Sequence, residues 1–65
     1  MEEDAAALAR YLTAMEGARA AQTCDDILRT FAFRKDEGNL ILWRAVARHL
    51  TRLLDDEHTA FLRDT

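Results

Sequence analysis

The sequence predicts an all-α fold, a small three-helix domain that spans residues 1–65. Three observations support this prediction. Apolar residues recur at intervals of three and four along most of the chain, which is the period of amphipathic helices. The 65 residues include no proline and only two glycines, so few positions interrupt a helix. Hydrophobic residues make up 49% of the chain and charged residues 32%, a composition typical of folded domains.

The first predicted helix begins with three acidic residues, 2–4, and ends at about Arg19. Negative charge stabilises a helix N-terminus, and the alanines that follow have high helix propensity. The expected apolar stripe of this helix consists of Leu8, Tyr11, Leu12, Met15 and Ala18. Gly17 falls inside the pattern, where it costs up to about 1 kcal/mol relative to alanine.

The second predicted helix begins at Thr23, which is a candidate N-cap that Asp26 answers three residues later. Residues 20–22 then form the joint with the first helix. The expected apolar residues of the second helix are Ile27, Leu28, Phe31 and Phe33. An alternative stays open, because the three-four spacing also continues from Leu8 to Phe31 without a joint. The chain would then be a helical hairpin, and two copies would form a structural four-helix bundle.

The main predicted helix follows a break at residues 34–39 and runs from Asn39 to about Leu62. Gly38 supplies backbone freedom at this break, and Asn39 or Asp36 is the candidate N-cap. The expected core face of the helix consists of Leu40, Trp43, Val46, Ala47, Leu50, Leu53, Leu54 and Phe61. We expect Trp43 to anchor this face because its large ring buries much apolar area.

Beside this core face lies a row of three arginines, each four residues from the next. Like charges at this spacing repel by about a few tenths of a kcal/mol per pair in an isolated helix, so we expect an anionic neighbour. That neighbour is either an acidic residue of the same chain, at 2–3 or 25–26, or the acidic surface of another protein. The candidate partner-binding residues are Ile41, Arg44, Arg48, Arg52 and His49.

Three other polar candidates have structural explanations. Cys24 is the only cysteine, so it cannot form an internal disulfide, and we expect it to be buried as a small hydrophobe. Residues 55–58 are Asp-Asp-Glu-His, the densest run of potential metal ligands, but no other helix offers matching carboxylates. We expect a solvated face there, with Arg52 paired to Asp55 or Asp56. His49 lies at the edge of the core face, where it can touch a partner or an ordinary hydrogen-bond acceptor.

Composition also excludes several function classes. A net charge of -3 argues against direct nucleic-acid binding, although Lys35 and the arginines would make such contacts. The sequence has no nucleophile with a recognisable base and no glycine-rich phosphate loop, so we expect no enzymatic activity and no cofactor. The N-terminus is acidic, and no apolar run approaches the roughly 18 residues of a membrane span, so we expect a cytoplasmic protein. A domain this small, without an internal disulfide or a structural metal site, is expected to form a homodimer.

Residues 11–54 also match a known pattern. Its members are Tyr11, Leu12, Thr23, Ile27, Leu28, Leu40, Ala47, His49 and Leu54, with Met15 in place of a leucine, Phe33 in place of a tyrosine and Trp43 in place of a phenylalanine. The pattern resembles the Hha/YmoA family, small helical bacterial proteins that bind the dimerisation region of the histone-like nucleoid-structuring protein. The resemblance implies a non-enzymatic regulator of transcription that acts by protein contact. Arg48 departs from the family, which has an acidic residue before the histidine.

Overall fold

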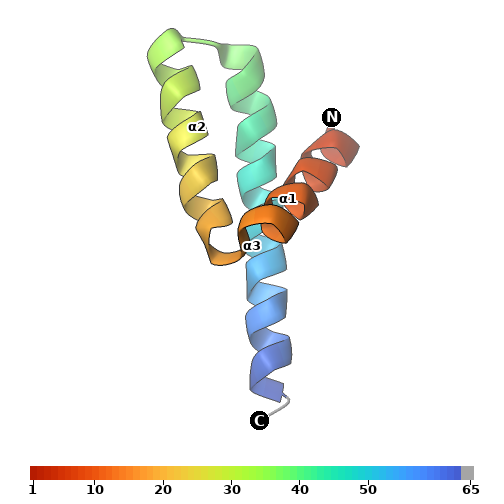
Figure 1. The fold of residues 1–65 in the computed structure, drawn as a ribbon. Helices are drawn as coiled ribbons and strands as arrows, with labels where there is room; N and C mark the ends of the chain where they lie inside the picture. The colour runs from red at the N-terminus through yellow and green to blue at the C-terminus, as the bar shows by residue number, and fades with distance from the viewer. Residues whose placement is uncertain (64–65) are drawn as a thin grey trace.

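A computed structural model shows that the described backbone, residues 1–63, is helical except at Met1, Lys35 and Asp36; side chains are described for residues 1–56. The elements are α1 (Glu2–Glu16), a short 3₁₀ helix η1 (Gly17–Arg19), α2 (Ala20–Arg34) and α3 (Glu37–Arg63). Figure 1 shows α2 and α3 side by side as an antiparallel hairpin, with α1 crossing the middle of α3. This arrangement confirms the predicted all-α fold. It is elongated, with extents of 45 × 21 × 16 Å.

The first break in the helical chain lies at Gly17, three residues before the predicted joint. Gly17 has φ 57° and ψ −125°, a conformation that residues with a Cβ rarely adopt. After η1, the alanines at the start of α2 continue the helix without a side-chain cap. Thr23 therefore lies within α2 and is not an N-cap. Both the joint at 20–22 and the uninterrupted helix from Leu8 to Phe31 were wrong predictions, because the chain turns at Gly17 instead.

The connection between α2 and α3 leaves few backbone groups unpaired. Lys35 adopts the left-handed conformation, with φ 56°. Its N–H donates to the carbonyl of Ala32 at 3.1 Å, and the N–H of Asp36 donates to that of Phe31 at 3.0 Å. These two bonds form a Schellman motif, which satisfies carbonyls that the end of a helix would otherwise leave free.

Asp36 caps α3, which confirms one of the two predicted candidates. Its Oδ1 accepts a hydrogen bond from the backbone N–H of Asn39 at 3.2 Å. The side-chain Nδ2 of Asn39 donates to Asp36 Oδ2 at 2.8 Å, so Asn39 holds both oxygens of the capping carboxylate. The helix therefore begins at Glu37, two residues earlier than predicted. The hydrogen bonds from Asn39 lower the pKa of the Asp36 carboxyl.

We expect Asp36→Asn to reduce the loss of stability at acid pH. The folded state lowers the Asp36 pKa, so the stability from the charged cap is present above the usual value of 3.8 and is lost as the pH falls through the folded-state pKa. Asparagine caps equally well and does not titrate. Urea denaturation at about pH 7 and about pH 3 measures how much free energy of unfolding each protein loses on acidification. The native sequence should lose more than Asp36→Asn. Equal losses would contradict the assignment of Asp36 as a charged cap.

The core combines a few large side chains with many small ones. Its buried residues are Ala5, Ala9, Leu12, Ala20, Cys24, Ala45, Val46 and Leu50. Partly buried residues pack around them, namely Leu8, Leu28, Leu42, Trp43, Ala47, Leu53 and Leu54. The predicted face of the main helix is confirmed by Val46 and Leu50, and Trp43 packs against the core while half-buried. Phe61 lies outside the described side chains.

Only part of the predicted stripe of α1 is confirmed: Leu12 is buried and Leu8 packs against the core. Tyr11 and Met15 are 61% and 66% exposed. α1 also turns Ala5 and Ala9 inward, because their methyl side chains let α1 approach α3 closely where bulky ones would hold it away. Two further residues of the predicted apolar faces are exposed, namely Ala18 and Phe33.

Candidate protein-binding surface

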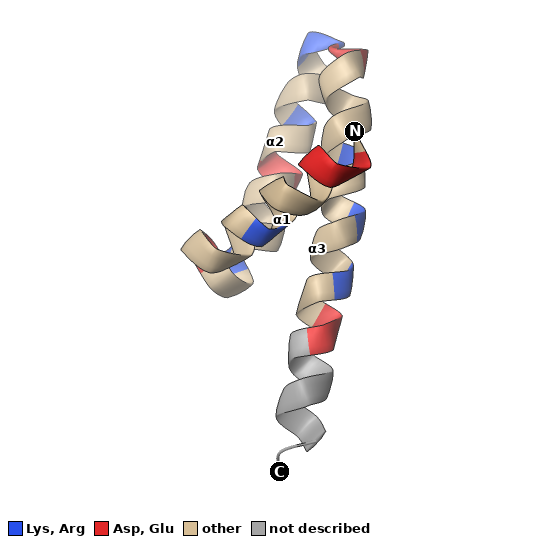
Figure 2. Cartoon of the chain, turned by 90° about the vertical axis from the view of Figure 1, so that its right-hand side faces the viewer, with Lys and Arg blue, Asp and Glu red and all other residues tan. Residues whose placement is uncertain are grey.

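The arginine row, consisting of Arg44, Arg48 and Arg52, lies exposed along α3. The helix presents the row to solvent because its opposite side carries the core residues Val46 and Leu50. Figure 2 shows basic segments spaced along α3, with the acidic first turn of α1 beside them. Ile41, near the start of α3, is 52% exposed and lines a hollow. The lining residues of that hollow are Glu37, Leu40, Ile41 and Arg44.

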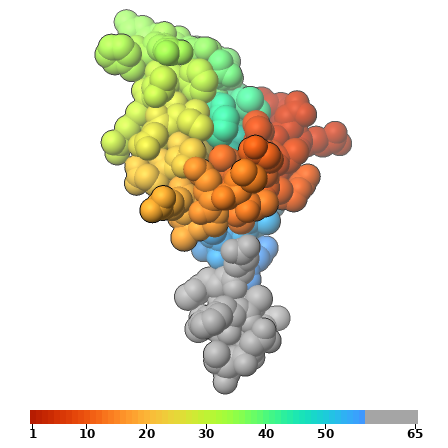
Figure 3. Space-filling view, viewed as in Figure 1, coloured from red at the N-terminus to blue at the C-terminus, as the bar shows by residue number. Residues whose placement is uncertain are grey.

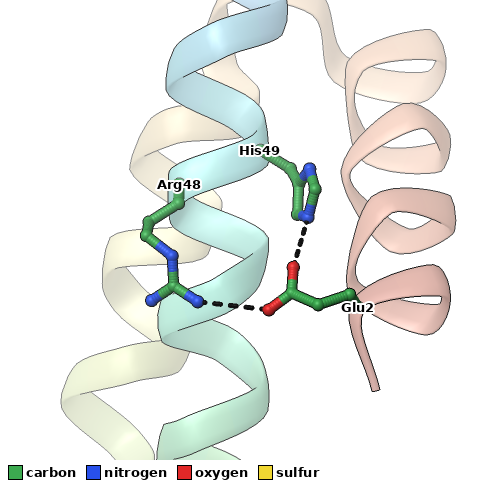
Figure 4. Close-up of polar contacts among 3 residues, drawn as sticks. All are labelled: Glu2, Arg48 and His49. Carbon is green, nitrogen blue, oxygen red and sulfur yellow. Dashed lines mark hydrogen bonds and ion pairs between the residues drawn. The ribbon is translucent and has the colours of Figure 1, made fainter.

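A carboxylate from α1 already occupies the middle of the row. Figure 4 shows Glu2 between Arg48 and His49, with one oxygen directed toward each. The distance from Arg48 Nη2 to Glu2 Oε1 is 3.4 Å, and that from His49 Nε2 to Glu2 Oε2 is 2.8 Å. Of the acidic residues considered from the sequence, Glu2 is thus the one that meets Arg48. The crossing of α1 over α3 brings these residues together although they are 46 and 47 positions apart.

The contact with Glu2 stabilises the fold only weakly, but it shows that this part of the row can bind a carboxylate. The hydrogen bond from His49, followed by attraction to Arg48, lowers the pKa of the Glu2 carboxyl below its usual 4.5. The Arg48 and Glu2 side chains are 67% and 61% exposed, so solvent screens their attraction. The His49 side chain is more enclosed, at 24%. His49 is therefore a boundary residue whose hydrogen-bond partner is a carboxylate.

The two ends of the row are open to solvent. Arg44 and Arg52 form no ion pair with another described side chain. The predicted pairing of Arg52 with Asp55 or Asp56 is absent, because exposed arginines gain little from such contacts and remain solvated. The ends of the row thus keep their guanidinium donors available, within the part of the chain whose side chains are described.

Cys24 is buried, with 2% exposure, as the sequence predicted. Its Sγ lies 3.8 Å from the backbone oxygen of Trp43. Burial raises the pKa of the thiol, and the neighbouring charge of Asp25 raises it further, so the reactive thiolate is disfavoured. Among the described side chains, no group of three or more histidines, cysteines and carboxylates gathers as a metal site would require. Glu57 and His58, from the run at 55–58, lie outside those side chains.

Sequence reasoning missed two apolar hollows. One runs along α2 and is lined by Thr23, Asp26, Ile27, Thr30, Phe31 and Arg34. The other lies between α2 and α3 and is lined by Ala21, Cys24, Asp25, Ala47, Leu50, Thr51 and Leu54. The signal for the second hollow is the pairing of small residues, Ala21 and Ala47, on facing helices. Such pairs leave space between helices that larger side chains would fill.

Comparison of the chain with family models, with curated proteins and with solved structures finds no match. The resemblance to the Hha/YmoA family therefore stays a prediction. Across the described residues, every helix is too short or too polar to cross a membrane.

Proposed function

We propose that this chain is a small non-enzymatic regulatory protein that binds an acidic surface of another protein through its arginine row. The observation that supports this proposal is the carboxylate of Glu2, which Arg48 and His49 hold by its two oxygens. The same kinds of donor are exposed at Arg44 and Arg52, on either side. Arginine suits this role because its planar, forked donors match the geometry of carboxylates.

The geometry of the surface indicates which groups a partner must present. The row extends over eight residues, or about 12 Å along the helix axis. Ile41 and the hollow beside it add an apolar contact at one end of this charged strip. Protein interfaces usually combine apolar contacts with charged ones, and arginine is enriched in them. The expected partner therefore presents carboxylates about one helical turn apart, together with one apolar side chain.

The resemblance to the Hha/YmoA family favours a nucleoid-associated or transcription protein as this partner, in the bacterial cytoplasm. Arg48 occupies the position where the family has an acidic residue. The charge of the docking surface is therefore reversed, and an acidic partner surface is the complementary one. Glu2 would be displaced from Arg48 and His49 when such a surface binds, since both use the same donors.

The proposal can be tested by capture of proteins from a lysate with the native chain, Arg52→Glu and Arg10→Glu. Arg10 is exposed on α1, outside the row, so its substitution changes the net charge equally. We expect the native chain and Arg10→Glu to capture the same protein and Arg52→Glu to lose it. With the purified protein, the affinity of Arg52→Glu should fall by about tenfold or more.

Two outcomes would contradict this function. Equal capture by all three proteins would remove the arginine row from the mechanism. Loss of capture after nuclease treatment, with affinity that falls steeply as salt increases, would favour direct binding of nucleic acid instead.

A further inference from the structure

A second surface of the hairpin is also uncovered. We define the uncovered face as Leu40, Arg44, Ala47, Thr51, Leu54 and Asp55 of α3. Figure 3 shows α1 covering the middle of α3 on one face of the molecule. The hollow beside Ala47 and Leu54, by contrast, is lined by α2 and α3 alone. Leu40, Ala47 and Leu54 are only half-buried and are spaced seven residues apart, which is the repeat of a helix that packs along another helix.

The uncovered face carries a basic residue and an acidic residue that can pair with their opposites on the same face of a second copy. Arg44 and Asp55 are both exposed and lie eleven residues apart. A second α3 can run antiparallel to the first, with the two-fold axis passing midway between positions 44 and 55. Arg44 of each copy then meets Asp55 of the other. The small residues Ala47 and Thr51 lie near this axis and let the helices approach. Thr51 Oγ1 already donates to the carbonyl of Ala47 at 3.0 Å, so its hydroxyl can be buried without loss.

We propose that the uncovered face binds a second copy of this chain. The two α3 helices pack antiparallel, and the two α2–α3 hairpins form a four-helix bundle with two-fold symmetry. Arg48 and Arg52 remain outside this contact, so dimerisation and binding of an acidic partner use different residues, apart from Arg44 at their border. The dimer goes beyond the proposed function and does not depend on it.

Sedimentation equilibrium over a range of concentrations tests the dimer. We expect the native chain to have twice its mass of 7.4 kDa. Ala47→Glu places two like charges near the axis and should weaken the dimer by at least about a hundredfold. Ala14→Glu, at an exposed position of α1, is the matched control and should dimerise as the native chain does. A native chain that stays monomeric throughout would overturn the proposal.

A charge exchange identifies the face without touching the core. Arg44→Asp should weaken the dimer because it sets two carboxylates against each other, and Arg44→Asp combined with Asp55→Arg should restore it. Both positions are exposed, so circular dichroism should show unchanged helix content in each variant. If Arg44→Asp leaves the dimer intact, or if the double exchange fails to restore it, the two copies meet through another surface.

Discussion

Gly17→Ala should lower the free energy of unfolding by about 1–3 kcal/mol, because it forces a Cβ into a sparsely populated backbone conformation. Gly17 has φ 57° and ψ −125°, and a Cβ built there meets no other atom within 4 Å. The cost is thus conformational and does not come from a steric clash with the core. For a domain of this size, each 1 kcal/mol corresponds to a change of about 4–8 °C in Tm.

Gly38→Ala is the matched control and should have the opposite sign. Gly38 lies in the first turn of α3, where a Cβ would meet only Asp36 Oδ1 at 3.9 Å, an ordinary contact. Alanine at a helical position reduces the freedom of the unfolded chain, so we expect a gain of up to about 1 kcal/mol. Thermal unfolding followed by circular dichroism measures both. If the two substitutions shift Tm in the same direction, the special role of Gly17 at the α1–η1 turn is wrong.

Ala9→Leu should destabilise the protein by about 1–3 kcal/mol, because it overpacks the contact between α1 and α3. Ala5, Ala9 and Ala45 are all fully buried in the same cluster, with no exposed surface. Three added carbons at Ala9 must push α1 away from α3 and separate Glu2 from His49. The larger apolar side chain would therefore reduce stability, although burial of apolar area alone would favour it.

Ala14→Leu separates this effect from helix propensity. Ala14 is exposed on the same helix, and leucine has nearly the helix propensity of alanine, so this control should change stability little. Amide hydrogen exchange should show that Ala9→Leu loses protection first in α1, while α2 and α3 keep theirs. Faster exchange in all three helices equally would mean that α1 is not a separately docked element.

The sequence predicted the main helix well because its periodicity comes from large residues. Val46 and Leu50 bury enough apolar surface to decide which side faces inward, and Asp36 supplies a local capping signal. The start of α2 was predicted poorly, because the capping pattern at Thr23 is local whereas the break depends on the backbone of Gly17. A glycine with positive φ and a glycine inside a helix are alike in sequence.

The candidate surface was predictable in part. The spacing of the arginine row was predictable, but its exposure was not, because it depends on how α1 and α2 pack against α3. Its contact with Glu2 required the crossing of α1, which in turn depends on the buried alanines. Alanine is only weakly hydrophobic, so it contributes little to an apolar pattern. The larger residues Tyr11 and Met15 therefore determine the predicted stripe, although both are exposed. Tertiary packing, and not local pattern, decides which small residues form a helix contact.

The two-residue connection at Lys35 and Asp36 has a consequence for the kinetics of folding. It joins α2 directly to α3, so the contacts within the hairpin are close in sequence, and such contacts form fast, in microseconds to milliseconds. We therefore expect the hairpin to form the folding nucleus and α1 to dock after the rate-limiting step. On this view, substitutions at the connection slow folding, whereas those in the alanine contact of α1 leave the folding rate unchanged and accelerate unfolding.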